Sequence, residues 1–222
     1  MTMGIFDSLK RKFGYDVKNN NGVNEEYWGK IIKTKYFKKA GRLHGKYYEY
    51  NWDENDHWIE MEINYNEGEK HGVAKYFWKK HISAEGIYKN GKLIGEIKKY
   101  FRFGDELTDI DIHPVVKELA DLEKGVYQVF SLKGKCLETS KIDGVIFDEG
   151  SSSSDDGYYG GIYPIRNGLC EKWFENGKLK ESGHWGKNNT SSIYNLSHRK
   201  GQHIQFYDNG NKFKEGEWID KS

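Results

Sequence analysis

The sequence is poor in the residues that build covalent or metal-bound frameworks. It contains only two cysteines, Cys136 and Cys170, which lie in separate segments without the spacing of a zinc or disulfide motif. We therefore expect both thiols to be small packing residues in a reducing compartment. No catalytic serine motif, phosphate-binding glycine loop or histidine–cysteine cluster is present either. The chain is accordingly not expected to be an enzyme or to need a cofactor or a metal.

Long apolar stretches are missing as well. No run approaches the roughly 18 apolar residues of a membrane-spanning helix, and the first residues lack the apolar core of a signal peptide. The expected location is therefore cytoplasmic.

The chain has almost no net charge, with 35 Lys and Arg against 34 Asp and Glu. This balance argues against a nucleic-acid binder with a uniformly basic surface. Charge is nevertheless unevenly distributed, because residues 1–50 hold eleven basic and five acidic side chains, whereas 105–156 hold five basic and thirteen acidic ones. We expect a molecule that is electrically polar from one part to another.

Aromatic residues make up 15% of the chain, and hydrophobic residues in total only 36%. Rings must therefore supply much of the apolar burial. One fully buried ring removes about 150–250 Å² from water, worth roughly 4–6 kcal/mol as an upper bound. A few rings in each structural unit are enough to hold a narrow sheet together.

A block of residues recurs three times. In each copy a glycine precedes an aromatic pair, and a second glycine follows fourteen or fifteen residues after the first, with another aromatic two places on. The copies are 72–88, 168–185 and 201–218. Such periodicity marks stacked supersecondary units that cannot bury their apolar faces alone. We predict a mainly β fold, an elongated and rolled antiparallel sheet of hairpins, whose work is binding rather than chemistry.

Three Asn-Gly pairs, at 90–91, 176–177 and 209–210, lie between strand-like runs. This dipeptide suits two-residue type I′ turns, which need a positive φ at both central positions. Where the glycines of successive hairpins lie further apart, we interpret the extra residues as loops inserted into the same kind of hairpin, at 52–58 and 188–198.

The phrases YKNGKLIG (88–95) and WFENGKL (173–179) resemble the bacterial variant of the MORN (membrane occupation and recognition nexus) repeat. The resemblance covers about 27–103 and 165–220. It implies a rolled sheet of successive antiparallel hairpins. That variant often occurs in antitoxin components and in immunity proteins encoded beside toxins. The resemblance thus implies stoichiometric binding that neutralises a cognate toxin, and it does not name the target.

A second function remains open, a membrane-proximal scaffold that binds anionic lipid or assembles proteins. The family's name points to membranes, and residues 4–13 predict a short basic amphipathic helix within the segment 1–14. This helix either docks on the first hairpin as a cap or touches a membrane surface. The oligomeric state is left open.

The chain divides by pattern into four segments. They are an N-terminal helix and linker (1–26), MORN-like repeats (27–104), an insertion (105–164) and further repeats (165–222). Within the insertion, Pro114 near the start, apolar residues on one side and Gly125 at the end predict a helix of about three turns. A Ser/Asp/Gly-rich stretch at 151–161 predicts a mobile loop. Alternating Asp109, Asp111 and His113 suit either a divalent cation or a solvated face with a helix cap.

Adjacent strand residues point to opposite faces, so each aromatic pair places one ring on either side of the sheet. One row of rings forms the core, and the other is covered by the inserted helix, contacts a partner or is exposed. Acidic residues in the 52–58 loop are suited to steering a basic protein. The predicted contacts with a protein partner are Tyr48, Tyr50, Asp53, Asp56, Trp58, Trp78 and Tyr100.

Overall fold

The computed structural model of the chain describes residues 16–54, 56–101, 114–148, 161–188 and 196–218. Fourteen strands follow one another in sequence order through one antiparallel open sheet. The prediction of a mainly β fold is confirmed. The chain splits into two compact units, the first ending its main segment at Ile94 and the second beginning at Gly95.

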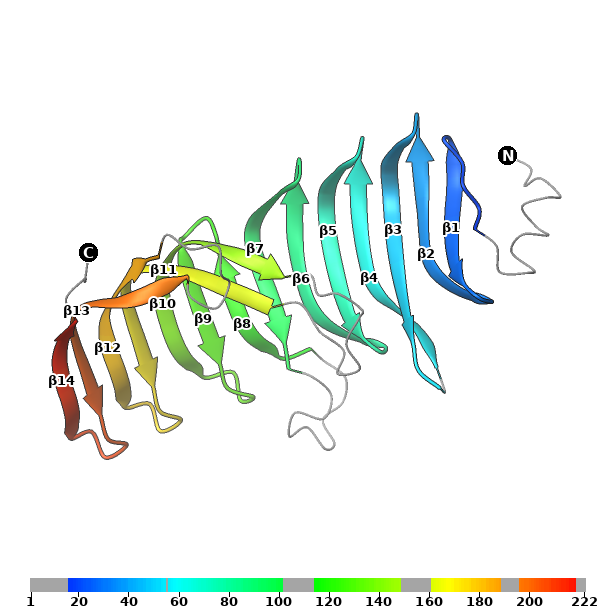
Figure 1. The fold of residues 1–222 in the computed structure, drawn as a ribbon. Coiled ribbons are helices and arrows are strands. Elements are labelled where there is room, and N and C mark those ends of the chain that lie inside the picture. Colours follow the sequence, from blue (N-terminus) through cyan, green and yellow to red (C-terminus); the bar gives the residue numbers. More distant parts are fainter. Residues whose placement is uncertain (1–15, 55, 102–113, 149–160, 189–195, 219–222) are drawn as a thin grey trace. The chain divides into compact units, whose positions relative to one another are not determined.

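Unit 1 is a run of hairpins that form a single curved layer, drawn from blue to green in Figure 1. Its strands are β1 (Gly22–Trp28), β2 (Ile31–Lys39), β3 (Arg42–Trp52), β4 (His57–Asn66), β5 (Glu69–Trp78) and β6 (His81–Lys89). The boundary between the units falls within β7 (Lys92–Tyr100).

Unit 2 continues the same antiparallel pairing. Its remaining strands are β8 (Val116–Asp121), β9 (Val126–Phe130), β10 (Cys136–Asp148), β11 (Gly161–Trp173), β12 (Leu179–Lys187), β13 (Ser197–Phe206) and β14 (Lys212–Trp218). Besides its neighbours in the sheet, β11 also contacts β8 and β13.

The predicted inserted helix is wrong, because this stretch forms the strand β8. Ala120, fully buried, lies opposite Ile97 of β7 and Tyr127 of β9. Backbone hydrogen bonding to two neighbours outweighs the helix-like spacing of the apolar residues, which by itself does not distinguish a short buried strand from a helix. The described residues contain no helix. The predicted N-terminal helix, at 4–13, lies outside them.

The core is built in rows, because residues directly opposite each other in an antiparallel pair lie on the same face. In unit 1, Tyr47 is opposite Ile63, and Ile63 is opposite Ala74. In unit 2 the corresponding kind of row joins Ser140 of β10 to Cys170 of β11. The inner members of these rows are 2% exposed or less, so a single layer still excludes water along its middle.

β-Bulges recur at the same place in successive hairpins. The register shifts between Glu26 and Tyr27 in β1, between Glu49 and Tyr50 in β3, and at Tyr76 in β5. Each shift leaves one extra residue on the partner strand, Lys33, Glu60 or Ser83, near the end of a strand that finishes at Trp28, Trp52 or Trp78. A bulge increases the local twist and bends the strand, so the repeat in sequence is also a repeat in curvature.

The Asn-Gly turns are confirmed in part. Gly91, Gly177 and Gly210 all have positive φ, at 75°, 85° and 93°, but among the three asparagines only Asn90 does, at 50°. The two-residue type I′ prediction therefore fails at the other two sites. There Gly177 N–H donates to the Phe174 carbonyl at 2.8 Å, as in a type I turn that closes with a glycine bulge.

Other predicted loops have mixed outcomes. The insertion at 52–58 is short, because β3 runs to Trp52 and β4 starts at His57. Part of the 188–198 insertion belongs to β13, which begins at Ser197. The Ser/Asp/Gly-rich stretch, the cation candidates Asp109, Asp111 and His113, and residues 189–195 lie outside the described residues.

Candidate functional site

Two of the predicted partner contacts, Tyr48 and Tyr50, lie side by side on β3. Their ring centroids are 6.4 Å apart, and the Tyr50 ring stacks on His57 at 5.1 Å with planes 9° from parallel. Lys46 Nζ lies 5.8 Å from the centre of the Tyr48 ring. Both rings are half-buried, and their contacts lie within the sheet itself.

The acidic pair of the β3–β4 turn has cationic partners within the chain. Asp53 lies 3.3 Å from Lys79 Nζ, and Asp56 lies 2.9 Å from Lys80 Nζ. Hydrogen bonds from Lys80 and from the His57 backbone N–H hold the pKa of Asp56 below its usual value. The charge of this turn is therefore locally balanced, which weakens its pull on a basic partner.

The predicted tryptophan contacts are packed against one another. Trp58 is only 7% exposed and meets Trp78 edge to face, with ring centroids 6.0 Å apart. Tyr100, at the end of β7 in unit 2, is also 7% exposed. Burial gives Trp58 and Tyr100 a packing role in this structure, and their partner contact stays a prediction. Trp28 is the most exposed tryptophan of the described residues, at 68%.

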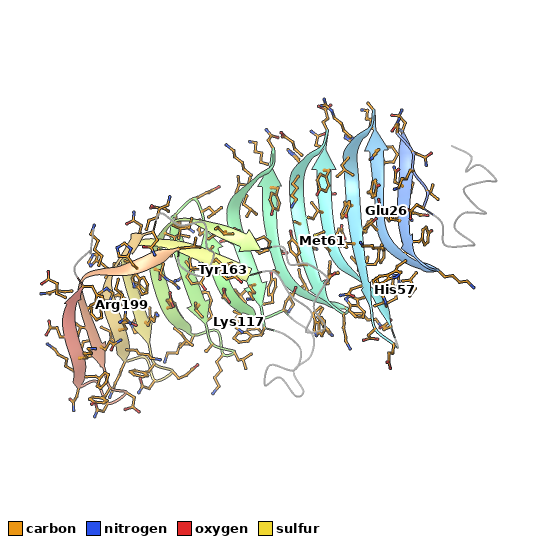
Figure 2. All side chains as sticks on the ribbon, viewed as in Figure 1. Glu26, His57, Met61, Lys117, Tyr163 and Arg199 are labelled. Atoms are coloured by element: carbon orange, nitrogen blue, oxygen red, sulfur yellow. The ribbon has the colours of Figure 1, made fainter. Side chains whose placement is uncertain are left out.

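A different surface of unit 1 gathers rings and carboxylates. Tyr36 and Tyr47 stack with centroids 5.8 Å apart and planes 21° from parallel, and Tyr65 meets Tyr47 at 5.9 Å. Tyr36 donates its hydroxyl to Glu26 Oε1 at 3.1 Å, and Glu49 acts electrostatically on Tyr47. We call these five residues the tyrosine–glutamate surface. Figure 2 labels Glu26 on β1 and Met61, which lies opposite Glu49 on β4.

Glu49, on this surface, is poorly compensated by cations. Partial burial raises the pKa of Glu49, Lys33 opposes that shift and Glu26 adds to it. Partial burial also raises the pKa of Glu60, a carboxylate of β4 that lies outside this surface and on which Glu49 acts, although Asn51 Nδ2 donates to Glu60 Oε1 at 3.2 Å. A carboxylate withdrawn from water without a matching cation favours any cation that can reach it.

Burial also raises the pKa of the Tyr36 and Tyr47 phenols, with nearby glutamates adding to the shift. Both phenols stay neutral at physiological pH and can donate hydrogen bonds. Neutral tyrosine faces beside ionised carboxylates are suited to cationic side chains, through cation–π attraction as well as charge.

Sequence reasoning missed this surface because alternation does not say which face of a sheet is covered. It selected Tyr48, whereas the neighbouring ring, Tyr47, belongs to the surface. One signal was available: Glu26 and Glu49 are 23 residues apart, the same distance as between Gly72 and Gly95 in the repeat. Carboxylates that recur with the repeat lie in register on alternate strands.

Unit 2 presents carboxylates and rings together with their cations. The Arg166 guanidinium lies 5.4 Å from the Tyr127 ring and 5.7 Å from the Trp185 ring, and its Nη2 donates to Glu138 Oε1 at 2.7 Å. Burial alone would raise the pKa of Glu138, but Arg166 and Lys172 bring it below its usual value.

The same arrangement recurs one hairpin further along unit 2. Arg199 Nη2 donates to Glu181 Oε1 at 2.7 Å, and the guanidinium lies 4.9 Å from the Trp218 ring. Arginines thus lie between rings and glutamates in unit 2, and both Glu138 and Glu181 are paired with cations of the chain.

Within the described part of the chain, no group of three or more His, Cys, Asp or Glu side chains is arranged to hold a metal ion. The same residues include no helix that is long and apolar enough to cross a membrane. Cys136 and Cys170 are both free thiols. Burial raises the pKa of the Cys170 thiol, which accepts a hydrogen bond from the Ser140 hydroxyl at 3.1 Å.

No protein-family model matches the chain, and no curated protein matches it significantly. The likeness to the MORN variant therefore stays an interpretation of the sequence.

Proposed function

We propose that the chain is a non-enzymatic protein-binding module that holds a basic protein on the tyrosine–glutamate surface. The observation that carries the proposal is Glu49, a half-buried carboxylate that acts electrostatically on the neighbouring Tyr47 ring. Among the described residues Glu49 forms no ion pair, and burial raises its pKa.

Interfaces between proteins are enriched in tyrosine, and buried charges there are arranged to meet opposite charges on the partner. A cationic side chain placed against Glu49 restores the interactions that the carboxylate lost on leaving water. The ring stack supplies apolar area around that contact. Affinity then depends on a few central groups rather than on the whole sheet.

The resemblance to antitoxin and immunity proteins supports a more specific role. In that role the partner is a toxin, and the module neutralises it by occupying its surface in a stoichiometric complex. A toxin gene next to the gene for this chain would support this role.

The test is affinity capture from the native cell with matched variants. Tyr47→Ala and Glu49→Gln should each lower the captured amount of one protein at least tenfold, whereas Tyr48→Ala, the ring on the other face, should retain most of it. Circular dichroism checks that each variant is folded. Equal capture by all variants would contradict the proposed surface.

The membrane scaffold is the competing outcome. If no protein is captured specifically and the chain instead sediments with vesicles of anionic lipid, with binding lost on deletion of residues 1–14, the scaffold replaces the module.

A further inference from the structure

We propose that the tyrosine–glutamate surface contains a seat for a single arginine side chain, between Glu26 and Glu49, that the partner fills. The inference rests on the proposed function and names the chemistry of the contact. The occupant is an arginine of a basic protein.

Unit 2 shows what such a seat looks like when the chain fills it. On β10, β11 and β12, Glu138 lies opposite Lys172, and Lys172 lies opposite Glu181. Lys172 Nζ is 3.8 Å from Glu138 and 3.7 Å from Glu181. One cation thus bridges two carboxylates across three strands.

Unit 1 repeats this register without the central cation. On β1, β2 and β3, Glu26 lies opposite Thr34, and Thr34 lies opposite Glu49. The position of the bridging lysine is therefore occupied by a short neutral side chain. Thr34 is only 4% exposed, and its Oγ1 has no hydrogen-bond partner. This buried hydroxyl has unused lone pairs beside two carboxylates that can only accept, so an N–H donor placed there could bond to all three groups.

Glu138, in the register that holds a cation, and Glu49, in the register that lacks one, have pKa values shifted in opposite directions. The pKa of Glu138 is below that of an ordinary glutamate, because the charges of Arg166 and Lys172 outweigh the effect of burial. At Glu49 burial has the largest effect on the pKa and raises it, and the opposing charge of Lys33 does not cancel that rise. The difference lies in the cations rather than in the carboxylates.

The rings favour arginine over lysine. In unit 2 the guanidinium of Arg166 lies against Tyr127 and Trp185 while it pairs with Glu138. Unit 1 offers the stacked rings of Tyr36 and Tyr47 beside its glutamates. A planar guanidinium stacks on rings and donates to carboxylates in the same plane, which a lysine ammonium cannot do.

Among the described residues of unit 1, no cation fills the seat. The only arginine among these residues, Arg42, begins β3 next to the β2–β3 turn. Lys38 Nζ lies 5.7 Å from the centre of the Tyr36 ring, and Lys33 acts on Glu49 without an ion pair. The bridging position itself belongs to Thr34.

The probe is N-acetyl-arginine amide, compared with N-acetyl-citrulline amide, its neutral analogue of the same shape. Each probe is titrated into the full chain, and binding is monitored through the NMR signals of unit 1. We expect the arginine probe to shift the resonances of Thr34 and Glu49 and to bind at least tenfold more tightly than citrulline. The lysine analogue should bind between the two. Equal binding of arginine and citrulline would overturn the proposal.

Two variants localise the binding. Thr34→Lys supplies the missing cation in the manner of Lys172, and Glu49→Gln removes one carboxylate. Both should abolish the preference for arginine, whereas Glu62→Gln on the opposite face, which pairs with Lys46 at 2.6 Å, should keep it. If Thr34→Lys does not fold, Glu49→Gln decides alone. An unchanged preference in Glu49→Gln contradicts the seat.

Different results would show that the seat is wrong and that the proposed function is wrong. If the arginine probe fails while protein capture still depends on Tyr47, the surface binds a partner but not through an arginine, and the seat is wrong. If the probe binds at Thr34 and Glu49 but no protein is captured, the seat is confirmed and the proposed function is wrong.

Discussion

Glu49 holds a position that an uncharged side chain would occupy at lower free energy. Its folded-state pKa is raised, so the folded chain binds a proton there more tightly than the unfolded chain does. The contribution of this group to stability therefore falls as the pH rises from the unfolded pKa through the folded one. At pH 7 the ionised form destabilises the fold.

We accordingly predict that Glu49→Gln is neutral or stabilising at pH 7. The expected gain is on the order of 0.5 kcal/mol, because the group remains partly screened by solvent, and it corresponds to a rise in Tm of about 1–2 °C. The difference between variant and wild type should shrink as the pH falls through the folded pKa of Glu49. Thermal unfolding followed by circular dichroism at pH 7 and pH 4 measures both effects. A clear loss of stability at pH 7 would show that Glu49 supports the fold.

Turn glycines provide a second test at the scale of single residues. Gly91 has a φ of 75° and has open space where a Cβ would be added, so only backbone strain opposes a side chain. Gly91→Val should cost about 1–2 kcal/mol and lower Tm by several degrees. Gly144 in β10 is the matched control, because it also has open space but no positive φ. Gly144→Val should leave Tm unchanged or raise it, and equal losses at both sites would contradict the turn assignment.

At the scale of elements, β8 shows where sequence reasoning reaches its limit. The apolar residues of this stretch fit one face of a helix, and Pro114 and Gly125 fit helix ends. A strand that is paired on both sides carries the same short apolar run, so local pattern alone cannot separate the two. The repeat hairpins were predictable because glycine phase, aromatic pairs and turn residues agree there. No such agreement exists between residues 105 and 164.

The strand and helix assignments of β8 predict opposite effects for two neighbouring substitutions. In the strand, Ala120 is fully buried, and Ala120→Leu should cost roughly 1–3 kcal/mol by overpacking. Leu119, which is partly exposed, should lose only about 1 kcal/mol on change to Ala. A helix with Leu119 on its buried face would reverse this order. Urea unfolding of both variants decides between them.

The candidate site was predicted less well than the fold, and the reason is also one of elements. Tyr47 and Tyr48 are adjacent, and the alternation of a strand states only that they face opposite ways. Which ring joins the glutamates depends on the register between β1, β2 and β3. Asp53 and Asp56 are exposed, but their pairing with Lys79 and Lys80 depends on two hairpin turns lying side by side.

For the whole molecule, we expect partner binding to depend on both pH and salt. A cation on the partner favours the ionised form of Glu49, so binding releases protons and weakens as the pH falls through the raised pKa of that group. Affinity for the captured protein should therefore fall progressively as the pH is lowered from 7 through that pKa. Added salt should mainly slow association. In Glu49→Gln the pH dependence should be smaller, which surface-binding kinetics on both proteins would show.

The central claim concerns which face of unit 1 meets the partner, and one measurement addresses it directly. A photo-crosslinking residue, p-benzoylphenylalanine, is placed at position 47 or 48, where the side chains point to opposite faces of β3. Each protein is irradiated with the captured partner at equal concentration. The account predicts a strong crosslink from position 47 and little from position 48. A crosslink from position 48 alone would contradict the tyrosine–glutamate surface as the binding site.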